Sequence, residues 1–255
     1  MGSALLKGWI GKGVKSITVV EPKPSAQLRA LAKQKKITLT AAPSAIKGKP
    51  SVCVVAIKPQ ILKGEAGALA GFARGGTLMI SIAAGTSVAA LAKAWGGKAR
   101  IIRAMPNTPG AIGAGITGLY AAKGVTAVDR KRATGLLSAL GATEWVNTEA
   151  LIDSVTAVSG SGPAYLFLMV EALSAAGMAE GLSKTQAEKF ARATVAGAGA
   201  LLAADKSPAS ALREAVTSPG GTTAAALAVL MGDDGLTALM KRAVKAARKR
   251  AQELR

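Results

Sequence analysis

The segment Ser218-Pro219-Gly220-Gly221-Thr222-Thr223 has the composition of a helix start that could hold an anion. Serine is a favoured N-cap and proline suits the first turn, so we expect Ser218 and Pro219 to begin the helix. The two glycines leave backbone amides uncovered, and bare amides at a helix N-terminus bind small carboxylates well. We therefore expect this segment to bind a carboxylate; the alternative is an ordinary capped helix.

Other segments have small side chains where predicted strands end. Ala56-Ile57-Lys58-Pro59 overlaps the end of the β-branched run 51–57, and Ile82-Ala83-Ala84 ends the run that starts at Thr77. Small side chains allow a cofactor to approach the backbone closely. Two prolines fix a loop around Asn107, whose amide can both donate and accept hydrogen bonds. We expect these residues to face a cofactor; the alternatives are a strand-to-helix turn at Lys58, close packing at the alanines and an internal loop cap at Asn107.

Glu21 ends a further predicted strand, Ile17–Glu21. In a nucleotide-binding sheet an acidic residue at this place can bind ribose hydroxyls. Lys23 and Ser25 follow it and could instead receive a 2′-phosphate, and a solvated turn is the third possibility. Such a fold normally opens with a strand and a G-x-G-x-x-G loop, yet this sequence begins as a helix already under way. We expect Gly2 to be the last glycine of that loop, with the strand and first glycines missing; a true start lacking this strand is the alternative.

Composition limits the chemistry. The sequence has no histidine and one cysteine, Cys53, which excludes His/Cys metal sites, histidine-based triads and an internal disulfide, so we expect no metal. A single thiol fits a reducing cytosol, and we see no secretory signal and no run of roughly 18 uncharged apolar residues, the length of a membrane span. The net charge is +19, but aromatics make up only 3% of the chain. We therefore expect a cytoplasmic protein without membrane or nucleic-acid partners.

The composition of the chain changes near residue 147. The first part alternates β-rich runs with helical stretches, which predicts a Rossmann-like, doubly wound parallel sheet over residues 1–147. Residues 148–255 are rich in strong helix formers, and we expect four to six helices there. So much alanine with so few aromatics suggests that a second subunit buries part of the apolar surface. The fold class is thus α/β followed by an all-helical dimerisation domain.

Four groups of residues together resemble the pyrroline-5-carboxylate reductase family, in the family's order and over nearly the whole chain. They are Val55-Ala-Ile-Lys-Pro-Gln60, Ser81-Ile-Ala-Ala-Gly85, Arg103-Ala-Met-Pro-Asn-Thr-Pro109, and the pair Ser159-Gly-Ser-Gly-Pro-Ala-Tyr165 and Val216-Thr-Ser-Pro-Gly-Gly-Thr-Thr223.

The resemblance implies an oxidoreductase that reduces 1-pyrroline-5-carboxylate to L-proline with NADPH or NADH. It implies that the amides around Ser218, Gly220, Gly221 and Thr222 hold the substrate carboxylate. It also implies that the Thr223 hydroxyl lies near the ring nitrogen as the catalytic group, and that Ser159 and Ser161 line the same cleft. A homodimer, or a larger assembly of dimers, is the implied oligomer.

Two alternatives stay open. A β-hydroxyacid dehydrogenase shares the two-domain plan, but it would need a catalytic lysine motif that we do not find. A basic, non-catalytic binding protein derived from the enzyme would be favoured by loss of the glycine loop.

Overall fold

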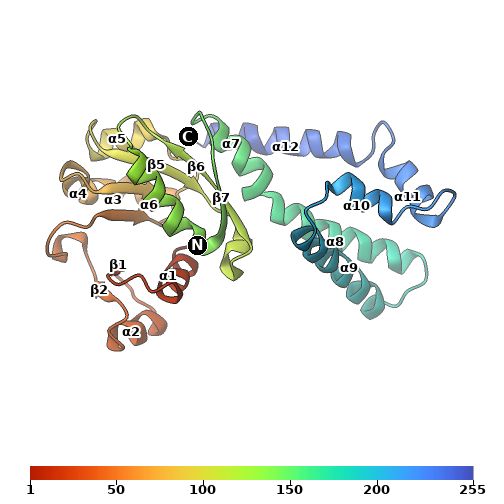
Figure 1. Ribbon diagram of the computed structural model, residues 1–255, viewed down its shortest axis with the longest axis horizontal. Coiled ribbons are helices and arrows are strands. Elements are labelled where there is room, and N and C mark those ends of the chain that lie inside the picture. The colour runs from red at the N-terminus through yellow and green to blue at the C-terminus, as the bar shows by residue number, and fades with distance from the viewer. Residues whose placement is uncertain (255) are drawn as a thin grey trace. The chain divides into compact units, whose positions relative to one another are not determined.

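The computed structural model describes residues 1–254, which form two compact units (Figure 1). The first contains residues 1–160 together with the C-terminal residues from Arg248, and the second contains Ser161–Ala247. The last strand ends at Trp145, close to the predicted change in composition near residue 147. The two compact units divide later, after Gly160. The division into domains at 147 stays a prediction.

The first unit holds seven strands in two sheets. They are β1 (Thr18–Val20), β2 (Thr38–Thr40), β3 (Val52–Val55), β4 (Leu78–Ser81), β5 (Arg100–Met105), β6 (Gly115–Ala121) and β7 (Gly141–Trp145). β1 and β2 pair in parallel as a separate ribbon, and the larger sheet has the order β3-β4-β5-β6-β7. Among the described residues, β1 pairs only with β2, and β3 pairs only with β4. Within the described residues, β1 and β3 therefore each have one unpaired edge.

The larger sheet is parallel except between β5 and β6, which run antiparallel. The cause is the short connection, residues 106–114, because a parallel crossover needs about a dozen residues or more. The predicted parallel, doubly wound sheet is thus confirmed over β3, β4 and β5, where helices separate one strand from the next.

Helices lie on both faces of the larger sheet. The helices of this unit are α1 (Gly2–Gly11), α2 (Ala26–Lys33), α3 (Pro59–Glu65), α4 (Ala70–Arg74), α5 (Val88–Trp95), α6 (Ala127–Leu137) and α7 (Leu151–Val155). On one face Leu62, Leu91 and Trp95 of α3 and α5 pack against Met79 and Ile101. On the other face Leu5 of α1 and Leu137 of α6 pack against Ile80 and Ile102. Figure 1 shows α1 next to α6, and the β1–β2 ribbon apart from the larger sheet.

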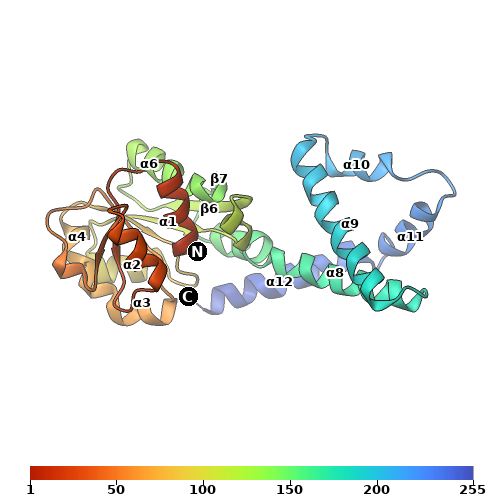
Figure 2. The same cartoon turned by 90° about the horizontal axis from the view of Figure 1, so that it is seen from below.

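The second unit is helical, as predicted. It contains α8 (Gly162–Ala179), α9 (Lys184–Ala204), α10 (Ala209–Ala215), α11 (Thr222–Leu230) and the greater part of α12 (Leu236–Glu253). α8 and α9 form a helical hairpin (Figure 2), and Ser183 caps α9 through a capping box with Gln186. With α7, the described chain has six α-helices after residue 147, within the expected range.

The second unit buries little of its apolar surface. In residues 161–247, all of which the structure describes, the buried side chains are Ser174, Ala187 and Ala191. Large apolar side chains stay exposed on α8 and α9, among them Phe167 at 64% and Phe190 at 59%. By length and composition alone, the continuous helical stretch Leu151–Ala179 could also cross a membrane. Alternatively, the surface of a second protein could bury the same apolar side chains.

Candidate active site

The residues predicted to face a cofactor follow neighbouring strands of the larger sheet. Val55, Ser81 and Arg103 are aligned in register across β3, β4 and β5. Ala56 and Ile82 therefore leave the sheet at the same, carboxyl edge, where open α/β sheets bind their ligands. Asn107 follows β5 two residues after that strand ends.

This edge carries little side-chain bulk. Ala56 and Ala84 are exposed, while Ala83 is 5% exposed and packs into the core. Lys58 is the exposed N-cap of α3, and Pro59 occupies its first turn, where the missing N–H costs nothing. A Cβ placed on Gly2 would lie 3.3 Å from the Ala56 Cβ. The structure thus brings Gly2 against the residues after β3, and a larger side chain there would crowd them.

The side-chain oxygens of Glu21 and Asn107 both accept hydrogen bonds from backbone amides close by in the chain. A Glu21 carboxylate oxygen accepts a hydrogen bond from the Lys23 amide at 3.0 Å, and Ser25 caps α2 by accepting from the Leu28 amide. The Asn107 Oδ1 atom accepts from the Ile116 amide at 2.9 Å. The internal cap weighed for Asn107 is therefore present, and cofactor contacts by either residue stay predictions.

The helix start in the second unit differs from the expected one. α11 begins at Thr222 with Gly221 as its N-cap, so Ser218 is not the cap and Pro219 is not in the first helical turn. The Gly221 amide is not bare either, because it donates to the Ser218 carbonyl at 3.1 Å.

The sequence Ser218–Gly221 forms a tight turn instead. Gly220 has a φ of +69°, and a Cβ on Gly221 would clash with the Ser218 Oγ. Proline followed by a glycine of positive φ is the signature of a type II turn. The amides without an intrahelical acceptor are those of the first turn, at Thr222, Thr223 and Ala224. The helix thus begins three residues later than predicted, and anion binding by its first-turn amides stays a prediction.

Ser159 and Ser161 lie where α7 passes into α8. Residues Thr156–Gly160 form a π-helical turn, an arrangement often found at functional sites. The Ser159 hydroxyl donates to the Val155 carbonyl at 3.0 Å, so while this bond is kept the oxygen can accept from a ligand. Ser161 is the N-cap position of α8 and makes no side-chain cap.

The cofactor candidates and Ser159 belong to the first unit, whereas Ser161 and Ser218–Thr223 belong to the second. Each group is assembled within its own unit by the contacts above. Among residues 1–254, no group of three or more acidic, histidine or cysteine side chains could hold a metal ion.

Sequence reasoning missed a buried ion pair beside the cofactor edge. Arg103 of β5, 3% exposed, donates to a Glu149 carboxylate oxygen at 2.7 Å. An arginine within a buried strand is a signal that the sequence did contain. Glu149 gave no such signal, because it lies 46 residues away in an irregular segment.

Two family models match the chain. One, described as pyrroline-5-carboxylate reductase dimerisation, covers residues 149–254, and the other, described as NADP oxidoreductase coenzyme F420-dependent, covers residues 1–85. The chain is 39% identical to a pyrroline-5-carboxylate reductase of Pseudomonas aeruginosa, over all of this chain and 93% of that protein. It is 44% identical to the reductase of a Synechocystis species over 80% of this chain and 74% of that one.

Solved structures show the same likeness. A pyrroline-5-carboxylate reductase from Coxiella burnetii matches with a TM-score of 0.89 and 35% identity, over 99% of this chain and 94% of that chain. A Plasmodium falciparum pyrroline carboxylate reductase with NADP bound matches with a TM-score of 0.80 and 26% identity, over 100% and 94%.

Proposed function

The chain belongs to the pyrroline-5-carboxylate reductase family and reduces 1-pyrroline-5-carboxylate to L-proline with NAD(P)H, and we propose which of its residues do this work. The observation that carries the function is the full-length similarity to enzymes of that name, at 39% identity in the first case. The two alternatives, a β-hydroxyacid dehydrogenase and a non-catalytic binding protein, have no such support.

We assign the carboxyl edge of the larger sheet to the cofactor. NAD(P)H supplies a hydride to the C=N carbon of the substrate, and the ring nitrogen carries the proton. The residues present fit such a group, because exposed Ala56 and Ala84 leave the backbone accessible just beyond the ends of β3 and β4. The exposed Lys58 places a positive charge at this edge, which suits a pyrophosphate. Gly2 and Glu21 would complete the site on the side of the β1–β2 ribbon.

We assign the start of α11 to the substrate. The first-turn amides of Thr222, Thr223 and Ala224 would hold the carboxylate, where the helix dipole favours a negative charge. The Thr223 hydroxyl would accept a hydrogen bond from the protonated ring nitrogen and orient the ring. Because a protonated imine is already electrophilic, such a reaction needs positioning more than a strong base, which fits a chain without histidine.

Ser159 would contribute as an acceptor only. Its hydroxyl proton is committed to the Val155 carbonyl, so its lone pairs would face the substrate nitrogen or a bound water. Ser161, at the start of α8, would donate to the carboxylate side. Ser218 and Gly220 act through the turn that presents α11, and direct contact by Ser218 is the weaker part of the assignment.

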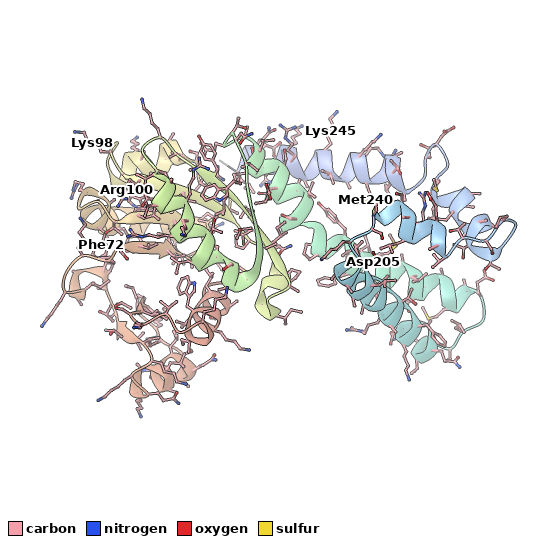
Figure 3. The ribbon with its side chains drawn as sticks, in the orientation of Figure 1. Phe72, Lys98, Arg100, Asp205, Met240 and Lys245 are labelled. Carbon is pink, nitrogen blue, oxygen red and sulfur yellow. The ribbon has the colours of Figure 1, made fainter. Side chains whose placement is uncertain are left out.

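We further propose a cytoplasmic homodimer formed through the helical unit. Its support is the match of residues 149–254 to a dimerisation family, together with the exposed phenylalanines of α8 and α9. We attribute the positive charge to solvated side chains such as the exposed Lys98 and Lys245 (Figure 3). Aromatic residues that could stack on nucleic-acid bases make up only 3% of the chain.

The direct test is a coupled measurement of substrate and cofactor. Purified protein should oxidise NADPH or NADH, with about one equivalent of cofactor consumed per proline formed. Omitting 1-pyrroline-5-carboxylate should abolish the oxidation. Cofactor binding without any proline produced would contradict the proposed reaction.

A further inference from the structure

Glu149 joins two separate elements through one carboxylate oxygen. Its Oε1 atom accepts a hydrogen bond from the Val88 amide at 2.7 Å and another from Arg103 Nη1 at 2.7 Å. The Glu149 side chain is 24% exposed and the Arg103 side chain is 3% exposed. Both bonds are charge-assisted, the stronger class of protein hydrogen bond.

Val88 is the first residue of α5, and α5 follows the loop Ile82–Ser87 directly. The end of this loop is thus held twice: Glu149 accepts from the Val88 amide, and Ser87 Oγ accepts from the Ala90 amide at 3.2 Å. The beginning of the loop is held by Ser81, whose Oγ accepts from the Ala83 amide at 3.3 Å. Arg103 lies opposite Ser81 in the strand register, so the same small region anchors both ends.

A buried arginine needs a counter-charge whatever its function. That need accounts for the bond between Glu149 and Arg103. It does not account for the use of the same oxygen to cap α5. Nor does it explain why the carboxylate comes from the segment between β7 and α7, which leads within ten residues to Ser159.

We infer that Glu149 is a positioning residue that fixes the loop Ile82–Ser87 for nicotinamide cofactor binding and links it to the segment carrying Ser159. Arg103 is its partner, which holds the carboxylate in place. The inference rests on the proposed function, because it takes this loop as part of the cofactor edge. Glu149 itself does not contact the cofactor.

The test compares Glu149→Ala, Glu149→Gln and the control Glu144→Ala, which removes an exposed carboxylate from β7. NADPH and NADH affinities are measured by fluorescence titration without substrate, alongside KM, kcat and thermal unfolding. We expect Glu149→Ala to weaken cofactor binding about tenfold, the effect of losing one such hydrogen bond. KM for 1-pyrroline-5-carboxylate should change less than KM for the cofactor. Glu149→Gln keeps the oxygen and should recover most of the affinity.

A lowered unfolding temperature with cofactor affinity equal to the control would overturn the inference, since that is the pattern of a purely structural ion pair. If Glu149→Ala does not fold, Val88→Pro replaces it, because proline suits the first helical position and removes the amide that donates to Glu149. Cofactor affinity equal to wild type in Val88→Pro would overturn the inference. Wild-type protein that binds NADPH but makes no proline would sink the proposed function, while the titrations would still test the loop.

Discussion

The substrate-binding groups proposed on α11 are hydroxyls and backbone amides. Thr223 is half-buried and Thr222 is exposed, although both are in the first turn of the same helix. Neighbouring helix residues point about 100° apart, so only one of the two hydroxyls can face a given ligand. The partial burial of Thr223 makes it the one positioned by its surroundings.

Thr223→Val should lower turnover and leave the fold and cofactor binding unchanged. Valine keeps the branched shape and removes the hydroxyl, so a hydrogen bond to a charged nitrogen worth about 1.5–3 kcal/mol is lost. That corresponds to a roughly ten- to hundredfold fall in kcat/KM. Thr222→Val is the matched control and should have a smaller effect, since its assigned contribution is the amide. Equal kcat/KM for wild type and Thr223→Val would remove this hydroxyl from the mechanism.

Burial controls the ionisation of Cys53. It packs against the core of the larger sheet, and burial raises the pKa of its thiol to about 11. The thiol therefore stays protonated in the folded protein at neutral and mildly alkaline pH, while an unfolded thiol ionises near pH 8.5. Because the folded pKa is raised, this contribution to stability is complete below about pH 8.5 and is lost as the pH rises through about 11.

Native protein at pH 8 should thus react with a thiol reagent much more slowly than urea-unfolded protein. The measurement is the time course of thiolate release or labelling at fixed reagent concentration, with and without urea. Equal rates in the two states would show that Cys53 is accessible and ionised in the fold.

At the scale of elements, an ion-pair network joins β5 to α6. Arg100, labelled in Figure 3, donates to both Asp129 oxygens at 2.7 and 2.9 Å and also to the Gly76 carbonyl. Asp129 in turn forms the capping box of α6 with Thr126. Burial alone would raise the pKa of Asp129, but the hydrogen bonds from Thr126 and the charge of Arg100 outweigh it, and the net shift is downward.

Asp129→Asn should therefore destabilise the protein at neutral pH and flatten its acid unfolding. A lowered folded pKa stabilises above the unfolded value of about 3.9 and loses that stability as the pH falls through the folded value. Breaking this largely buried pair should cost about 2–4 kcal/mol at pH 7. Urea unfolding at pH 7 and at pH 3 measures it, with Asp233→Asn on an exposed turn as control. A deficit of equal size at both pH values would contradict the ionic origin.

Some elements could be predicted from sequence and others could not, for identifiable reasons. Runs of β-branched residues revealed β3 and β4, because strands buried on both faces are continuously apolar. β6 and β7 were missed because glycine opens both, and a second glycine interrupts β6; their stability comes from pairing with neighbours. The turn before α11 was predictable, since Pro219-Gly220 is a type II signature, but it was taken for a helix start. The cap by Glu149 was not, because it joins residues 61 apart.

For the whole molecule, composition predicted a part with alternating strands and helices followed by an all-helical part. It did not predict how each part would pack. Alanine and few aromatics indicated thin helices with little bulk to bury, and the second unit does bury only small side chains in the range 161–247. Function was predictable because four groups of residues matched one family in order. The net charge of +19 has no structural explanation beyond the solvated lysines and arginines.

α8 exposes large apolar side chains that are adjacent in sequence. Phe167 and Leu168 are 64% and 63% exposed, and contiguous exposed apolar side chains usually mark an interaction surface. Light scattering at micromolar concentration should give twice the mass of one chain. Phe167→Glu would place an unpaired charge in that interface and should weaken association roughly thirtyfold or more, the effect of losing a central aromatic contact. Lys36→Glu, which changes an exposed residue of the first unit, should leave the dimer intact. If wild type shows only the mass of one chain across the concentration range, the helical unit does not dimerise, and the apolar face of α8 needs another partner.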